Sequence, residues 1–134
     1  MPRKRHRRKI LESPRFKGYK PYGAQDIGND NIELFYEEYE AVKLADYHLL
    51  NHEEAGFYMG VSRATFARIY ENARRKIAHA MVEAKEIKAV PGNVIFDKTS
   101  YLCNDCNNRF TTKDLQYKRF CPTCSSDNFN VIQK

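Results

Sequence analysis

The sequence lacks three features that would place it in a membrane, on a secretory route or in an enzyme class. No apolar run approaches the ~20 residues that a helix needs to cross a bilayer. The basic start is followed by residues 10–14, which do not form the apolar segment of a signal peptide. The four histidines are scattered, and no nucleophile stands at a spacing from a base that indicates catalysis. We therefore expect a cytoplasmic protein that is not an enzyme and has no membrane span.

Cysteine is also scarce, and its placement is informative. The chain has 134 residues and four cysteines, all of them within residues 103–124. Structural disulfides are rare in the reducing cytosol, so metal ligation is the expected role of these cysteines. A metal also allows a short segment to fold around a small apolar core. We therefore expect two small domains rather than one.

Positive charge is concentrated in two parts of the chain. Residues 1–20 carry nine Lys or Arg against one Glu, whereas residues 21–62 carry one Lys against nine acids. Residues 63–90 return to seven basic residues against three acids. Such clustering is typical of a surface that contacts a nucleic acid backbone. The alternative is a solvated run of charges without a partner.

The first half of the chain predicts a basic arm followed by a helix. Residues 1–31 hold several Pro and Gly, which favour an arm and loop over regular structure. Residues 36–50 repeat apolar side chains at spacings of three and four, which predicts an amphipathic helix. Its apolar side holds Tyr39, Val42, Ala45 and Leu49, and its opposite, solvated side holds Glu37, Glu38, Glu40 and Lys43.

Residues 51–69 predict a short helix, a tight turn and a second helix. Asn51 and Glu54 have the spacing of a capping box, and Gly60 suits the left-handed residue that ends a helix. Ser62 can cap the next helix, which we expect over residues 63–88. DNA-binding helix-turn-helix motifs use such a turn and place the start of the second helix in the major groove. This domain is expected to cover residues 32–90.

The predicted partner of this domain is double-stranded DNA. Arg and Asn side chains bind guanine and adenine through paired hydrogen bonds, and a basic arm can enter the neighbouring minor groove. The candidate contacts are Arg63, Thr65, Arg68, Asn72 and Arg75 in the second helix and Arg3, Lys4, Arg5, Arg7 and Arg8 in the arm. Residues 74–76 suit phosphates better than bases. The alternative is a solvated face of a plain helical bundle.

Two CxxC pairs predict a zinc ribbon over residues 91–134. Fourteen residues separate the pairs, and the ligands are Cys103, Cys106, Cys121 and Cys124. Each pair can form a knuckle that directs two thiolates at one tetrahedral zinc, with Zn–S near ~2.3 Å. Four protein ligands leave no place for water, so one structural zinc is expected. We expect a hairpin over residues 109–120 and a final strand over residues 129–132.

Three alternatives for the cysteines remain open at this point: rubredoxin-like iron, a redox dithiol and disulfides. Rubredoxin knuckles usually place Gly after the second Cys of a pair, whereas this chain has Asn107 and Ser125 there. The purpose of the ribbon is also open. Its basic residues could contact nucleic acid, or its hairpin could bind a protein.

Several segments together resemble a known family. They are Met1-Pro2-Arg3, Pro21-Tyr22-Gly23, residues 38–46, Glu53-Glu54-Ala55, residues 59–63, Thr65-Phe66 and residues 73–76. This order is similar to an uncharacterised bacterial and archaeal family whose members are predicted to bind DNA through a helix-turn-helix like region four of sigma factors. The resemblance covers about residues 1–89 and implies DNA binding and transcription regulation. The chain departs from the family at Gly56, where Ala is usual.

The sequence thus predicts a mainly α helix-turn-helix domain followed by a small β zinc ribbon. The expected function is transcription regulation through DNA binding. The alternative is an adaptor that docks on RNA polymerase or another protein through the helices and the ribbon. A homodimer is a further option, because residues 78–84 offer apolar side chains for a seam. A long helix that packs on its own domain explains these residues equally well.

Overall fold

The computed structural model describes residues 7–24, 28 and 30–134. The chain folds as two compact units, Met1–Ile95 and Phe96–Lys134. The sequence placed the boundary between residues 90 and 91. The first unit extends beyond that point because the strand β5 (Val94–Phe96) pairs with β1 (Arg8–Ile10). Among the described residues, no helix is both long enough and apolar enough to cross a membrane.

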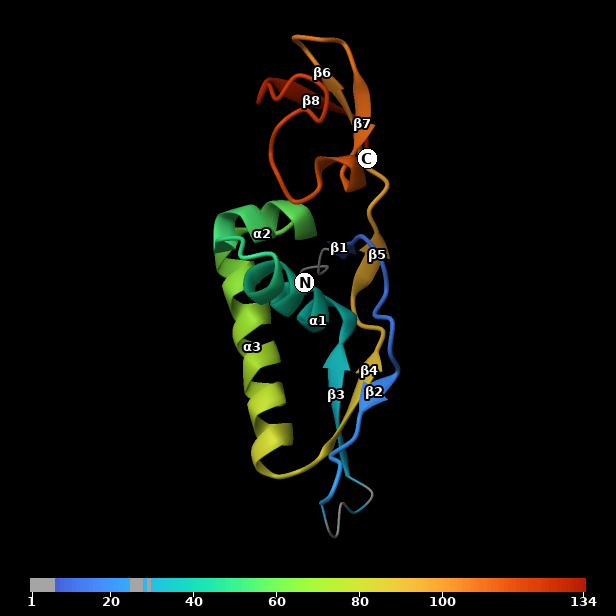
Figure 1. The fold of residues 1–134 in the computed structure, drawn as a ribbon, viewed down its shortest axis with the longest axis vertical. Helices are drawn as coiled ribbons and strands as arrows, with labels where there is room; N and C mark the ends of the chain where they lie inside the picture. The colour runs from blue at the N-terminus through green and yellow to red at the C-terminus, as the bar shows by residue number, and fades with distance from the viewer. Residues whose placement is uncertain (1–6, 25–27, 29) are drawn as a thin grey trace, which may run out of the picture. The chain divides into compact units, whose positions relative to one another are not determined.

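The first unit contains a three-stranded sheet in the order β2 (Gly18–Tyr19), β4 (Glu86–Val90), β3 (Asn31–Phe35) (Figure 1). The strands β3 and β4 are parallel, with Ile32 opposite Ile87. The strand β2 lies antiparallel on the other edge of β4. All the helices of this unit lie in the chain between β3 and β4, which is the crossover that a parallel pair requires.

Three α-helices complete the part of this unit that the structure describes. The first, α1 (Tyr36–Val42), continues as a π-helical segment, η1 (Lys43–Tyr47). The second is α2 (His52–Met59), and the third, α3 (Arg63–Val82), packs against α1, α2 and the strands β3 and β4 (Figure 1). The core between these elements is fully buried, and its side chains include Ile10, Leu44, Ala55, Met59 and Phe66.

The prediction of a mainly α fold is wrong. The described residues form three α-helices and eight strands, so the fold is mixed α and β. The sequence predicts an arm and loop up to residue 31 and the helix-turn-helix domain from residue 32, but residues 8–10, 18–19 and 31–35 form strands. Asn31 pairs with Glu86, 55 positions later in the chain, and a partner so distant leaves no sign in local periodicity.

The predicted helix over residues 63–88 is correspondingly too long. The helix α3 ends at Val82, and Ala84 adopts a left-handed backbone conformation with φ of 52°. That conformation turns the chain out of the helix and into β4. Residues 86–88 therefore pair with β3 instead of extending α3.

The solvated side predicted for the first helix is also wrong, because its acids are buried. Glu37, Glu38 and Glu40 are all less than 10% exposed, whereas Leu49 is 81% exposed. Glu38 accepts hydrogen bonds from Lys76 Nζ at 2.7 Å and from the backbone N–H of Phe35 at 2.8 Å. Hydropathy patterns assume that a carboxylate faces water, but partners such as these allow it to be buried.

The second unit is a small antiparallel sheet in the order β7 (Arg109–Thr111), β6 (Ser100–Cys103), β8 (Phe129–Gln133). The rings of Tyr101, Phe110 and Phe129 lie 5.1–5.4 Å apart between centroids and form its apolar cluster. The predicted final strand is confirmed as β8. The predicted hairpin over residues 109–120 is wrong, because β7 pairs with β6 and Lys113–Leu115 form the 3-10 turn η2.

Candidate functional site

The four cysteines of the second unit converge on one point. Their Sγ atoms all lie within 4.8 Å of one another. The Sγ atoms of Cys103 and Cys124 are 3.6 Å apart, as are those of Cys106 and Cys121. A tetrahedral ion with Zn–S near ~2.3 Å needs sulfurs about 3.8 Å apart. The cluster therefore has the donors and the dimensions to hold a metal such as zinc.

Backbone hydrogen bonds shape the two loops that hold these sulfurs. Asn107 donates its N–H to the carbonyl of Cys103 at 3.0 Å, and Ser125 donates to Cys121 at 2.9 Å. Asn107 and Ser125 have φ of 59° and 62°, the left-handed conformation for which Gly is the usual residue. Asn108 Nδ2 joins the loops by donating to Thr123 Oγ1 at 2.7 Å. These backbone hydrogen bonds direct the four sulfurs at one point.

The thiols of the cluster differ in how readily they lose a proton. The backbone N–H of Asn108 lowers the pKa of Cys106, but desolvation and the other three thiols outweigh it and raise that pKa to about 12. Burial would raise the pKa of Cys121, whereas the backbone N–H groups of Cys124 and Thr123 and the neighbouring thiols lower it to about 6. A thiolate at Cys121 is thus favoured at neutral pH. A bound cation would favour the other three thiolates.

The helices α2 and α3 are joined by a turn that follows the predicted capping signals. Asn51 and Glu54 form the capping box of α2, and Gly60 ends that helix with φ of 68°. The side chain of Ser62 accepts a hydrogen bond from the N–H of Thr65 at the start of α3. A Cβ on Gly56 would lie 2.8 Å from the carbonyl oxygen of Val61. Gly56 therefore permits the close approach of α2 to this turn.

One side of α3 presents predicted DNA contacts to solvent. Arg68, Asn72 and Arg75 are all exposed. Thr65 Oγ1 accepts hydrogen bonds from Ser62 Oγ at 3.0 Å and from Arg68 Nη2 at 3.3 Å, which orients the Arg68 guanidinium. Arg75 forms an exposed ion pair with Glu71 at 2.8 Å. The outward direction expected for this polar stripe is what the structure has.

Arg63 is exposed but lies apart from that stripe. Counted along α3, it stands about 140° around the helix axis from Arg68. With His52, Glu53 and Tyr70 it lines a hollow of about 590 Å³. Lys76 also departs from its expected phosphate contact, because its ammonium group pairs with Glu38 and lies 4.0 Å from the centroid of the Phe35 ring.

The basic arm is described only in part. Arg3, Lys4 and Arg5 lie outside the described residues. Arg7 is exposed, and Arg8 belongs to β1. Lys9 Cδ lies 3.3 Å from the position that a Cβ on Gly60 would take. The strand β1 therefore lies beside the turn between α2 and α3, an adjacency that no local sequence signal indicated.

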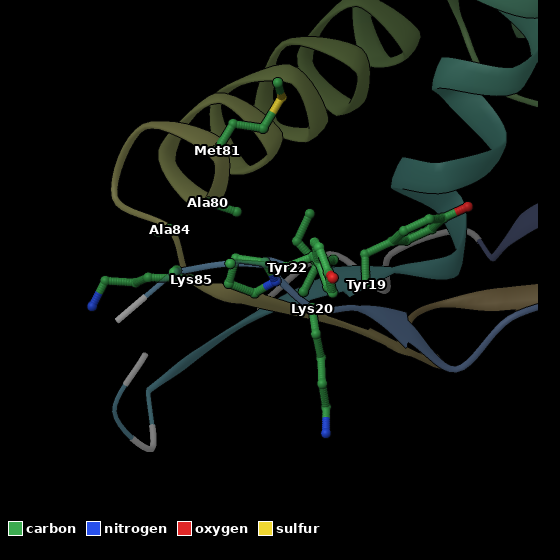
Figure 2. A pocket seen from close by; sticks show the side chains of 11 residues that line it. Tyr19, Lys20, Tyr22, Ala80, Met81, Ala84 and Lys85 are labelled. Carbon is green, nitrogen blue, oxygen red and sulfur yellow. The ribbon is translucent and has the colours of Figure 1, made fainter. Parts of the chain in front are cut away.

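A second hollow, not predicted from the sequence, lies at the other end of α3. It measures about 450 Å³, and its lining includes Tyr19 of β2, Tyr22 after that strand and Met81 of α3. Figure 2 shows Tyr22 and Met81 on opposite sides of this hollow, with the Lys20 side chain directed away from α3. Tyr22, Met81 and Val82 are each more than 70% exposed, so apolar surface is available here.

Comparison with known proteins assigns the chain to a family. Residues 1–97 match the family described as "Protein of unknown function DUF134". A "UPF0251 protein" of Methanothermobacter thermautotrophicus is 38% identical over 132 residues, 98% of this chain and 68% of the relative. A "UPF0251 protein" of Caldicellulosiruptor saccharolyticus is 41% identical over 133 residues, 99% of this chain and 91% of the relative. No solved structure matches the chain.

These matches confirm the predicted resemblance to an uncharacterised prokaryotic family and extend it. A third relative, the "UPF0251 protein" of Chloroherpeton thalassium, is 39% identical over 128 residues, 96% of this chain and 85% of its own length. The similarity to the relatives thus continues through the cysteine-rich unit. The chain belongs to the DUF134 family, together with the UPF0251 proteins.

Proposed function

We propose that this protein is a cytoplasmic, non-enzymatic DNA-binding regulator of transcription. In this proposal α2, the turn and α3 act as a helix-turn-helix like region four of sigma factors. The start of α3 enters the major groove and the basic arm follows a neighbouring groove. The observation that carries the proposal is the exposed stripe of Arg68, Asn72 and Arg75 on the helix that follows this turn.

Two further features support DNA as the partner. The hydrogen bonds from Ser62 and Arg68 to Thr65 hold the Arg68 side chain in one orientation, which lowers the entropy lost on binding a guanine edge. The strand β1 brings Lys9 beside the same turn, where its charge can attract phosphates. Phosphate contacts would fix the register, and Arg68 and Asn72 would supply base preference.

The experiment is selection of bound duplexes from a genomic-fragment library, followed by affinity measurements on the selected site. Arg68→Ala should weaken binding to that site by about 1–3 kcal/mol and relax the base preference. Arg74→Ala is the matched control, because Arg74 is an exposed arginine of α3 that stacks on Tyr70, away from the stripe. As an expected phosphate contact, it should weaken binding to all sequences alike and keep the base preference. Equal effects of the two substitutions on base preference, or no selectivity over bulk DNA, would overturn the proposal.

We further propose that the cysteine cluster holds one structural zinc. Four thiolates complete a tetrahedral shell, so the ion has no open position for catalysis. The apolar cluster of this unit consists chiefly of three aromatic rings, and a bound ion would supply much of its folding free energy. Metal analysis of the purified protein distinguishes zinc from iron, and thiol titration before and after chelation distinguishes ligation from disulfides.

One observation favours a protein partner in addition to DNA. The exposed side chains of Tyr22, Met81 and Val82 form apolar surface at the end of α3 opposite the proposed groove contact. The candidate partners for this surface are RNA polymerase and a second copy of this chain. Met81→Ser should reduce recovery of polymerase from a nuclease-treated lysate, or shift the mass of the purified protein in solution. If the substitution changes neither the recovery of polymerase nor the mass in solution, this surface binds neither polymerase nor a second copy of the chain.

A further inference from the structure

We propose that the ribbon loop, defined as residues 113–120, binds single-stranded nucleic acid. The proposed contact uses the second unit and is separate from the duplex contact proposed for α3. Cations of the loop would bind the phosphates, and the ring of Phe120 would stack on one base. The proposal stands on the charge of the loop, the exposure of an aromatic ring and the way the loop is anchored.

Three of the eight residues of the ribbon loop are basic, and one is acidic. Lys113, Lys118 and Arg119 are exposed, and Arg109 is exposed on the adjacent strand β7. The only acid in the loop, Asp114, accepts hydrogen bonds from the backbone N–H of Thr111 at 2.9 Å and from its hydroxyl at 3.1 Å. Asp114 keeps its negative charge, so the loop has a net positive charge of modest size.

Phe120 supplies a stacking surface among these cations. Its side chain is 51% exposed, although the rings of Tyr101 and Phe110 in the same unit are buried. Proteins that bind single strands combine a basic groove with aromatic rings on which unpaired bases stack. A duplex offers phosphates but keeps its bases stacked on one another. The combination of Phe120 with Lys118 and Arg119 therefore favours a single strand over a duplex.

The loop is anchored, so binding would cost little conformational entropy. Leu115 is buried, and its carbonyl accepts a hydrogen bond from the N–H of Lys118 at 3.0 Å. Gln116 and Tyr117 are consecutive residues with φ of 51° and 64°, a left-handed pair without glycine. Such conformations are costly and are retained where surrounding contacts or a function require them. The anchoring holds Lys118, Arg119 and Phe120 at one end of the loop.

A competing explanation for the basic residues is that they balance the metal site. A divalent ion with four thiolates carries a net charge of about −2, which nearby cations would stabilise. This role needs no exposed aromatic ring and predicts no affinity for an oligonucleotide. Variants that change Phe120 therefore distinguish the two explanations.

The first test measures binding of fluorescent mixed-sequence DNA and RNA oligonucleotides of about 12 nucleotides to the metal-loaded full chain. Phe120→Ala should weaken this binding about tenfold, whereas Phe96→Ala, which removes another exposed ring, should not. Replacing Lys113 and Lys118 by Gln should lower the salt slope of the affinity by about 1.4. Metal content confirms that each variant is folded. Comparison of the affinities for the DNA and RNA oligonucleotides identifies which nucleic acid the loop prefers.

The second test uses the absence of tryptophan from the chain. Phe120→Trp introduces one tryptophan, which can be excited selectively over the nine tyrosines, and stacking on a base should quench its fluorescence when oligonucleotide is added. The matched variant Phe96→Trp should show no quenching. An unquenched Phe120→Trp variant together with an unchanged affinity of Phe120→Ala would overturn the proposal.

The duplex proposal fails or succeeds separately from this one. Arg68→Ala should remove base preference on duplex DNA and leave single-strand affinity unchanged. Phe120→Ala should weaken single-strand binding and leave the base preference on duplex DNA unchanged. If Arg68→Ala reduces single-strand affinity and Phe120→Ala does not, the strand binds α3 instead of the ribbon loop, and the inference about the loop is wrong.

Discussion

The two units reach a stable fold by different routes. The first buries large side chains such as Phe66, Met59 and Leu44 between helices and a sheet. The second has a cluster of three aromatic rings and four cysteines whose sulfurs lie within 4.8 Å of one another. Burial of apolar area can stabilise the first unit without any ion. A core as small as that of the second unit would depend on a metal bound by the cysteines. The comparison predicts that each unit can be disrupted by a change that leaves the other folded.

Removal of the proposed zinc should have the largest effect, and this effect should be confined to the second unit. Cys103→Ser deletes a buried ligand, and the loss of metal binding should remove on the order of 10 kcal/mol of apparent folding free energy from this unit. Amide NMR spectra should lose the dispersed signals of residues 96–134 and keep those of α1 to α3. Binding should also weaken in acid, because protons compete with the metal for the thiolates.

A chelator applied to the unaltered protein is the control, because added zinc should restore the spectrum. If the second unit kept its dispersed signals without metal, the comparison between the units would be wrong. If α3 unfolded with it, the units would not be independent.

Phe66→Ala should have the next largest effect, in the first unit. Phe66 is fully buried, so its truncation should leave a cavity and cost about 3–5 kcal/mol of unfolding free energy. Denaturant titration followed by circular dichroism measures this loss, and metal content should stay at the level of the unaltered protein. Phe96→Ala, which removes an exposed ring, should change stability by less than about 0.5 kcal/mol. A loss of metal in Phe66→Ala would contradict the separation of the units.

The features that were predictable from sequence are the local ones. The caps at Asn51 and Ser62, the left-handed Gly60 and the cysteine spacing each act within a few residues, and the structure has all of them. The parallel pairing of β3 with β4 was missed because it joins segments that are distant in the chain. The burial of Glu38 was missed because it depends on Lys76, a partner 38 positions away.

Gly56→Ala should have a smaller effect, and its sign tests the packing of the first unit. Helix propensity alone predicts a gain of about 1 kcal/mol for α2. The new methyl group would lie 2.8 Å from the carbonyl oxygen of Val61, so the turn before α3 would have to move. Overpacking of this kind costs about 1–3 kcal/mol, and we expect a net loss of stability. A higher melting temperature would show that the turn adjusts without cost.

Glu40→Gln should have the smallest effect on the unfolding free energy, and this effect should depend on pH. Glu40 is 2% exposed, and burial raises its pKa although Lys43, whose Nζ is 3.2 Å from Oε1, lowers it. A raised pKa in the folded state means that this group contributes stability below its unfolded pKa and loses the contribution as pH rises through the folded pKa. The difference in unfolding free energy between the Gln variant and the unaltered protein should therefore shift in favour of Gln as the pH rises above about 4.3, the pKa of an unfolded Glu.

The same titration in a Lys43→Gln background separates burial from pairing. Without the ammonium group, burial acts on Glu40 unopposed, so the shift in favour of Gln should become larger. Urea titrations at several pH values measure it, and the metal content of the second unit should be the same in all variants at neutral pH. A shift in favour of Glu with rising pH would mean that the ion pair outweighs desolvation. The buried acids of α1 would then stabilise the first unit by charge pairing, in addition to its apolar core.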